Sequence, residues 1–209
     1  MNFMRKFFIS ISLIILGCAA MAAQSNLTPV QILEKAVAPI TAAKGVDAQF
    51  QVSNSGYTGK GQIKTSGNKF TVQLPDAMVW YNGCDLYTYN ERTGETTIVT
   101  PTADELVESN PLNYVSGASK QYNVAFSTVK KTGKYVLELT PKTKGGYVKR
   151  VTLTVDKTSF KPEKIVVEPS SGAPLAADIS SFKTGVTVPA ADFEYPKAKY
   201  PKAEIVDLR

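Results

Sequence analysis

The fold is decided by the stretch Val46-Asp47-Ala48-Gln49-Phe50-Gln51-Val52, in which apolar residues occupy every second position. The stretch Lys69-Phe70-Thr71-Val72-Gln73-Leu74 alternates in the same way. Successive side chains of an extended strand point to opposite faces, so each stretch places its apolar residues on one side and its polar residues on the other. The sequence therefore predicts strands that share one apolar face of a sheet.

Turn residues separate further stretches of this kind at the spacing of hairpins. The hairpin signal is strongest at Asn82-Gly83, where a type I′ turn places both central residues at positive φ. We expect a further edge strand at Phe193-Glu194-Tyr195. The antiparallel strands, about eleven in number, are expected at 46–52, 57–65, 69–74, 77–81, 84–90, 95–100, 121–129, 134–141, 147–156, 162–168 and 174–182. Such a meander is typical of a mainly β (α+β) protein whose sheet curls into a barrel or stays unclosed.

Two segments carry helix signals instead of strand signals. Thr28-Pro29-Val30-Gln31 combines an N-cap residue, a proline at the first helical position and the glutamine of a capping box. Residues 101–118 begin with a second capping box, from Thr102 to Glu105, and contain a proline break at Asn110-Pro111. Their apolar residues need a surface to lie on, and the sheet offers one. We therefore expect both segments to cover the apolar face.

The N-terminus has the composition of a secretory signal. Two basic residues precede the apolar run 7–16, which is shorter than the roughly 20 residues of a membrane span. Small residues follow, and Ala20-Met21-Ala22 fits a cleavage site before Ala23. This predicts a signal peptide at residues 1–22 and a single exported domain at residues 23–209.

A second processing route stays open. Ile15-Leu16-Gly17-Cys18 approximates a lipobox, which would leave a lipid on Cys18. Leu16 is bulky where a small residue is usual, and this favours cleavage before Ala23. If Cys18 is acylated, we expect a protein of the same fold that is anchored to a membrane.

The composition excludes most catalytic and metal-binding chemistry. The chain contains no histidine, and Cys84 is the one cysteine that remains after removal of the signal. Ser-His-Asp and Cys-His catalysis and His/Cys metal sites are therefore not expected, and neither are an enzymatic activity or a cofactor. At Cys84 we expect a small, half-buried thiol. The lysines are scattered, so nucleic acid is not an expected partner.

Four aromatic residues surround the Asn82-Gly83 turn, namely Trp80, Tyr81, Tyr87 and Tyr89. Rings of this kind stack on sugars, but they also stabilise hairpins as cross-strand pairs. A glycan-binding or structural β-module is therefore an alternative to a carrier.

Short motifs follow one another in a fixed order over nearly the whole chain after the signal. They are Gly59-Lys60-Gly61-Gln62-Ile63, Lys69-Phe70, Asn82-Gly83-Cys84-Asp85-Leu86-Tyr87-Thr88-Tyr89-Asn90, Asn110-Pro111-Leu112, Leu139-Thr140-Pro141-Lys142 and Ala190-Ala191-Asp192-Phe193-Glu194-Tyr195. In this order and spacing the chain resembles the periplasmic outer-membrane lipoprotein carriers of the LolA type.

The resemblance implies an unclosed antiparallel barrel of about eleven strands, with short helices that form a lid over its apolar concave face. It implies that the protein, expected as a monomer in the periplasm of a Gram-negative bacterium, takes acylated lipoproteins from an inner-membrane lipoprotein-releasing transporter and delivers them to the outer membrane, where an acceptor receives them. If Cys18 is acylated, the alternative is a membrane-anchored acceptor of lipoproteins or an envelope sensor of the same fold. One motif departs from the family. Gly67-Asn68 stands where a basic residue and a proline are usual. Because the family's arginine is linked to lid closure, the resemblance supplies no gating residue here.

The apolar face then becomes an expected acyl-binding wall, with the helices above it as a lid. The wall residues are Phe50, Phe70, Val72, Leu74, Leu137, Leu139, Val151 and Leu153. The lid residues are Leu33, Val37, Leu106, Val107, Leu112 and Val115. Each of these side chains also fits the alternative interpretation of an ordinary core residue.

The processing of the N-terminus gives a first testable prediction. The mature chain is expected to begin at Ala23, because the A-x-A site is the better match. Intact-mass spectrometry of protein purified from the envelope measures this directly. A lipid-modified chain that begins at Cys18 would contradict it and favour the anchored form.

Overall fold

The computed structural model describes residues 27–42, 44–143 and 145–209, so the signal sequence and Cys18 lie outside the described residues. Twelve strands form one unclosed sheet in the order β12-β6-β5-β4-β3-β2-β1-β11-β10-β9-β8-β7. The strands are β1 (Gly45–Asn54), β2 (Tyr57–Ser66), β3 (Lys69–Gln73), β4 (Ala77–Tyr81), β5 (Leu86–Asn90), β6 (Glu95–Val99), β7 (Tyr122–Phe126), β8 (Lys134–Pro141), β9 (Val148–Asp156), β10 (Pro162–Pro169), β11 (Leu175–Val186) and β12 (Glu204–Asp207).

All eleven strands expected from the sequence are present, and each pairs with its neighbours in antiparallel register. The twelfth strand, β12, was not expected and pairs with β6 in parallel. The edge strand expected at Phe193-Glu194-Tyr195 is wrong, because a 3₁₀ helix, η2 (Ala190–Phe193), ends there and Glu194 and Tyr195 continue in irregular backbone. The backbone N–H of Glu194 closes that helix on the Ala191 oxygen, and the Phe193 side chain is buried.

The turn between β4 and β5 differs from the expected type I′ turn. Tyr81 pairs with Leu86, so four residues form the loop. Gly83 has a φ of 99°, whereas Asn82 is not among the residues with positive φ. The Asn82 side chain instead accepts hydrogen bonds from the backbone N–H groups of Cys84 and Asp85, at 3.0 and 2.9 Å. The turn is therefore closed by a side chain, which a rule for two-residue hairpins does not anticipate.

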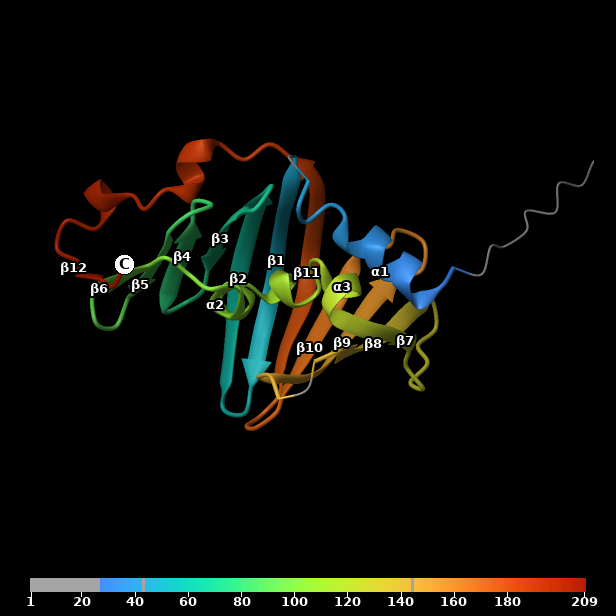
Figure 1. The fold of residues 1–209 in the computed structure, drawn as a ribbon. Helices are drawn as coiled ribbons and strands as arrows, with labels where there is room; N and C mark the ends of the chain where they lie inside the picture. The colour runs from blue at the N-terminus through green and yellow to red at the C-terminus, as the bar shows by residue number, and fades with distance from the viewer. Residues whose placement is uncertain (1–26, 43, 144) are drawn as a thin grey trace, which may run out of the picture.

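Short helices lie over one face of the sheet, on the near side of Figure 1. They are α1 (Pro29–Val37), α2 (Ala103–Ser109), the 3₁₀ helix η1 (Pro111–Tyr114) and α3 (Ala118–Gln121). Both expected capping boxes are present, at Thr28 and Thr102, and the proline break separates α2 from η1. A further 3₁₀ turn, η3 (Lys197–Lys199), lies in the C-terminal segment. Within the described part of the chain, no helix combines the length and apolar character needed to span a bilayer.

The connection from α1 to β1 is fixed to the sheet by hydrogen bonds. The buried Thr65 hydroxyl donates to the Ile40 oxygen at 2.8 Å and accepts from the Val46 N–H at 3.1 Å. The N–H of Gly67 donates to the Ala42 oxygen at 3.0 Å. These bonds satisfy backbone groups that would otherwise be buried without partners, and they hold α1 in place.

A close approach at Gly45 gives a prediction for stability. A Cβ atom at this position would lie 1.8 Å from the backbone oxygen of Thr65, so the strand pair must shift to accept it. We expect Gly45→Ala to lower the free energy of unfolding by about 2–3 kcal/mol. Gly146→Ala is the matched control, because nothing lies within 4 Å of a Cβ atom there. Urea denaturation of the two variants measures the difference, and equal midpoints would contradict this account.

Candidate functional site

The eight expected wall residues lie on one face of the sheet. Val72 is opposite Ile63, which in turn is opposite Ala48, and Leu137 is opposite Leu153. Direct cross-strand neighbours share a face, so the alternation within each strand extends across the sheet. Seven of the eight side chains are buried, and Leu74 is half-buried. Their role in binding acyl chains remains a prediction.

The centre of the wall comes from side chains that the expected set of wall residues left out, although their strands were expected. Its buried side chains are Val46, Ala48, Ile63, Ile165, Val167 and Phe182, from β1, β2, β10 and β11. Ile63 is the one large apolar residue of Gly59-Lys60-Gly61-Gln62-Ile63, so alternation alone does not identify it. Ile165 and Val167 lie in the continuous apolar run Ile165-Val166-Val167, which hides a period of two.

The expected lid residues pack against this wall. Leu33, Leu112 and Val115 are fully buried in the same core cluster, and Val37 and Leu106 are half-buried against it. The Val107 side chain lies outside the described residues. Tyr114 and Ala118 are also buried in the cluster, and the sequence analysis missed them. Helix α1 lies against β7 and β8, whereas η1 lies over the centre of the wall.

Polar groups of the insert 101–118 form hydrogen bonds within the insert. The buried Asn110 accepts from the Leu112 N–H at 2.8 Å and donates to Asn113 at 3.3 Å. Asn113 donates to the Leu106 oxygen at 2.7 Å, which ties η1 to α2. Leu112 and Val115, by contrast, meet the wall through apolar contacts. The α2–η1 unit is therefore held together by directional bonds, and it rests on the sheet through non-directional ones.

The N-terminus of α2 carries its own electrostatic stabilisation. Glu105 accepts hydrogen bonds from the backbone N–H and the hydroxyl of Thr102, at 2.7 and 2.9 Å. Both bonds favour the carboxylate and lower the pKa of Glu105, the backbone bond more strongly. The cap therefore keeps its charge at neutral pH.

The space between η1 and the wall is closed. An enclosed cavity of about 10 Å³ remains there, which is the volume of one small probe sphere. Phe50, Ile63 and Ile165 line it from the sheet, and Pro111 and Leu112 line it from the lid. Side chains of the lid thus cover this part of the wall in the structure.

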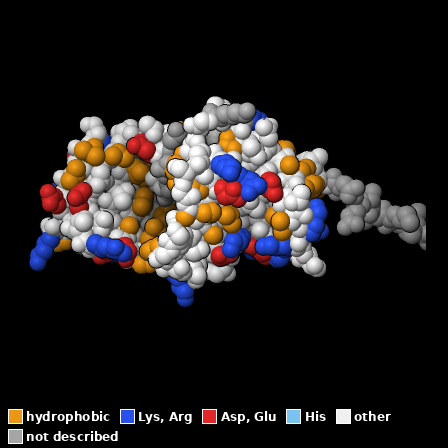
Figure 2. Space-filling view, turned by 90° about the horizontal axis from the view of Figure 1, so that it is seen from below, with side chains coloured by type: hydrophobic (Ala, Val, Ile, Leu, Met, Phe, Trp, Pro, Cys, Tyr) orange, Lys and Arg blue, Asp and Glu red, His pale blue; other side chains and the backbone are white. Residues whose placement is uncertain are grey.

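Larger openings lie at the margins of the lid. A hollow of about 380 Å³ follows the seam between α2 and the part of the sheet formed by the β2–β3 turn and the end of β4. Leu106, Phe70 and Tyr81 form its apolar part, while Asn68 and Lys69 form part of its polar rim. The Gly67-Asn68 departure from the family pattern thus lies in this seam. Figure 2 views the molecule from the opposite end, from below, where hydrophobic side chains also line a hollow in the surface.

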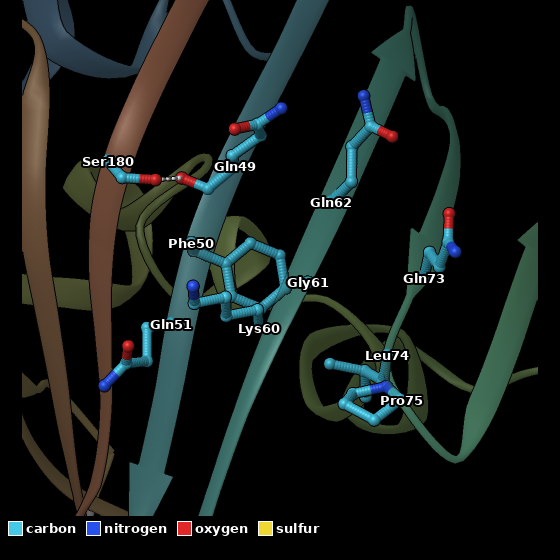
Figure 3. Close-up of a pocket in the computed structure, with 10 residues that line it drawn as sticks. All are labelled: Gln49, Phe50, Gln51, Lys60, Gly61, Gln62, Gln73, Leu74, Pro75 and Ser180. Carbon is cyan, nitrogen blue, oxygen red and sulfur yellow. Dashed lines mark hydrogen bonds between the residues drawn. The ribbon is translucent and has the colours of Figure 1, made fainter.

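A second kind of hollow, of about 490 Å³, is lined mainly by amides (Figure 3). Gln49, Gln62 and Gln73 are direct cross-strand neighbours on β1, β2 and β3. They alternate with the wall residues, which places their side chains on the face opposite the lid. Phe50 and Leu74 of the wall also line this hollow, so it borders the apolar face as well.

Three of the four aromatic residues around the β4–β5 turn pack against the C-terminal segment, whereas Tyr81 packs against Phe70 in the core. Trp80 lies 5.4 Å from the Tyr195 ring and 5.7 Å from the Tyr200 ring, and Tyr87 stacks on Tyr195 at 5.5 Å. Burial, followed by the nearby Asp85 carboxylate, raises the pKa of Tyr87. The tail therefore occupies the ring faces that a sugar would need, and packing accounts for this cluster.

Cys84 is exposed rather than half-buried, because it lies at the surface of the β4–β5 loop and not in the strand that follows. In the described part of the chain, no three His, Cys, Asp or Glu side chains come together in a group suited to a metal ion.

The fold recurs in solved structures. A conserved, uncharacterized protein from Thermus thermophilus superposes with a TM-score of 0.56 at 14% identity, over 85% of this chain and 98% of that one. A LolA superfamily protein from Nitrosomonas europaea gives a TM-score of 0.42 at 16% identity, over 81% and 98% of the two chains. A putative outer membrane lipoprotein-sorting protein domain from Vibrio parahaemolyticus gives 0.43 at 12% identity, over 81% and 100%.

No curated protein matches the chain at a significant level. The sequence does match the family described as outer membrane lipoprotein carrier protein LolA over residues 19–170, well over half of its length. The order of motifs, the unclosed sheet and the lid agree with this match. The chain therefore belongs to the LolA family of outer membrane lipoprotein carrier proteins.

Proposed function

We propose that this protein carries lipoproteins by holding their acyl chains between the wall and the lid. In this proposal residues 1–22 are removed on export, and residues 23–209 act as one domain in the periplasm. The cargo comes from an inner-membrane lipoprotein-releasing transporter and passes to the outer membrane or to an acceptor there. The supporting observation is the closed apolar contact between Leu112, Val115 and the face of the sheet.

The energetics of an acyl chain fit this contact. Each exposed CH₂ group costs roughly 0.8 kcal/mol in water, so a long chain carries on the order of 10 kcal/mol of unfavourable exposure. A carrier has to shield most of this surface and still release it. An apolar wall does so without a specific bond that must break at release. A catalytic group has no role in such a cycle, which makes this a binding protein rather than an enzyme.

Because the cavity is closed, the acyl chain has to displace part of the lid. Helix α1 is held to the sheet through Thr65, and α3 is held by Lys142, whose Nζ donates to the Ser119 and Lys120 oxygens at 3.2 and 3.1 Å. The α2–η1 unit has its own internal bonds and rests on the wall through Leu112. We therefore assign α2–η1 as the movable part of the lid and α1 and α3 as its fixed parts.

Binding of acyl chains is tested by competition with a hydrophobic fluorescent probe. We expect the mature protein to bind the probe and a diacylated peptide to displace it at micromolar concentration. The same peptide without acyl chains is the control and should leave the probe bound. Failure of the acylated peptide to displace the probe would contradict the carrier function.

The assignment of the movable part is tested at Leu112, which is 2% exposed. Truncation to alanine removes about 1.5 kcal/mol of burial that favours the closed lid. A larger open fraction should then raise the apparent affinity for acylated peptide up to about tenfold. Leu208→Ala, at a residue that is 64% exposed, is the control and should change nothing. Circular dichroism verifies folding, and weaker binding by a folded Leu112→Ala would show that this side chain contacts the ligand instead of closing the lid.

A further inference from the structure

Three aromatic rings form a row at the open edge of the sheet. Phe126 ends β7, Tyr135 lies near the start of β8, and Phe160 follows β9. Their ring centroids are 6.3 Å apart in each successive pair. Phe160 has a φ of 56°, and among the described residues it is the one non-glycine residue with positive φ. A bulky side chain adopts this conformation at a cost, so packing holds the ring in the row against local strain.

Each ring of the row carries one lysine ammonium group. Lys130, Lys157 and Lys35 hold their Nζ atoms 6.0, 5.2 and 4.9 Å from the three centroids, in row order. These are cation–π distances. Within the described side chains none of the three lysines forms an ion pair.

The loop that follows β7 adds exposed apolar surface to these charges. Phe126 is 45% exposed and Val129 is 56% exposed, and Lys130 and Lys131 follow directly. The cation–π contacts explain why the lysines lie over the rings, but they do not explain why Val129 projects into water. Apolar side chains that are exposed together and bordered by charge mark an interaction site.

Two loops contribute to one continuous surface here. The Lys157 N–H donates to the Gly133 oxygen at 3.0 Å, which joins the β9–β10 turn to the β7–β8 loop. We call this surface the basic–aromatic end; it comprises Lys35, Phe126, Val129, Lys130, Lys131 and Lys157. In Figure 2, basic and hydrophobic side chains lie beside one another on the right, where β7 to β10 lie.

The acidic groups nearby do not cancel this charge. Asp156 and Glu163 both pair with Lys134, which lies outside the basic–aromatic end as defined. Hydrogen bonds from the Ser159 backbone and then from Lys134 lower the pKa of Asp156. Glu34 precedes Lys35 on α1 and offsets one of the four lysines. The basic–aromatic end therefore has a net positive charge.

We propose that the basic–aromatic end docks on the headgroup region of an anionic phospholipid bilayer. Lysines attract the surface and keep their ammonium groups at the phosphates, while Phe126 and Val129 enter the interface. Each contribution alone is weak, so the docking is reversible and sensitive to salt. The proposal does not rest on the carrier function, since it uses none of the wall or lid residues.

Cosedimentation with vesicles tests the proposal without any acylated ligand. The mature protein should bind vesicles of phosphatidylglycerol mixed with phosphatidylcholine, and not vesicles of phosphatidylcholine alone. The double variant Lys130→Glu/Lys131→Glu should lower the partition coefficient about tenfold or more. Val129→Ser keeps the charge and should lower it about threefold through the loss of apolar surface.

Lys197→Glu/Lys202→Glu is the matched control, because it makes the same change of net charge at exposed positions of the C-terminal segment. It should retain most of the binding. Equal losses in the two double variants would overturn the proposal in favour of general charge attraction. Absence of binding to the anionic vesicles would also overturn it. So would a Lys130→Glu/Lys131→Glu variant that binds vesicles normally but no longer binds a membrane-protein partner. A protein that fails to bind acylated peptide can still pass this test, so the two proposals fail separately.

Discussion

An unclosed sheet with one apolar face cannot bury that face by curling alone, and every other feature of this protein follows from this constraint. In a closed barrel the strands opposite one another would fill the interior with their own side chains. Here Ile63, Leu137 and Val151 need a second layer, which α1 and the helices between β6 and β7 supply. The cover is built from short pieces and contributes no strand. It can therefore separate from the sheet without breaking a ladder of backbone hydrogen bonds.

The two parts of the cover are attached by different interactions, and this difference separates stability from movement. Thr65 and Gly67 tie the end of α1 to β2 through directional bonds, so α1 is part of the permanent core. Asn110 and Asn113 hold α2 and η1 together, but these hydrogen bonds join residues of the α2–η1 unit to one another and not to the sheet. The turn at Gly67-Asn68, where the family usually has its basic residue and proline, bonds to the α1–β1 connection in this chain. In this structure the α2–η1 unit meets the wall through the apolar side chains of Leu112 and Val115.

The sequence predicted the strands and caps well because both depend on local chemistry. Alternation located β1 and β3, and the capping boxes at Thr28 and Thr102 located the starts of α1 and α2. Prediction from the sequence failed where contacts between distant segments decide the structure. Nothing local in Glu204–Asp207 indicates a parallel pairing with β6, and Ile165 and Val167 lie in a run without a period of two. Whether a wall side chain borders free space or a lid side chain also depends on the packing of distant segments, so the closure of the cavity could not be predicted.

The two edges of the sheet differ in how they are covered, and this difference helps to explain the basic–aromatic end. Strand β12 covers the edge at β6. Arg209 forms ion pairs with Asp207 and Asp85, which hold β12 in place. Hydrogen bonds from the Arg209 side chain and backbone lower the pKa of Asp207 to about 2. Strand β7 has no such cover, and lysines are a common defence of an open edge against pairing with another sheet. Edge defence would place them along β7 itself, yet Tyr122–Phe126 contains none, and the lysines cluster in the loops beyond its end. Defence also gives no reason to expose Phe126 and Val129 beside them. The combination of exposed apolar groups with ammonium groups is explained better by docking on an anionic phospholipid bilayer, whose interface is itself part apolar and part anionic.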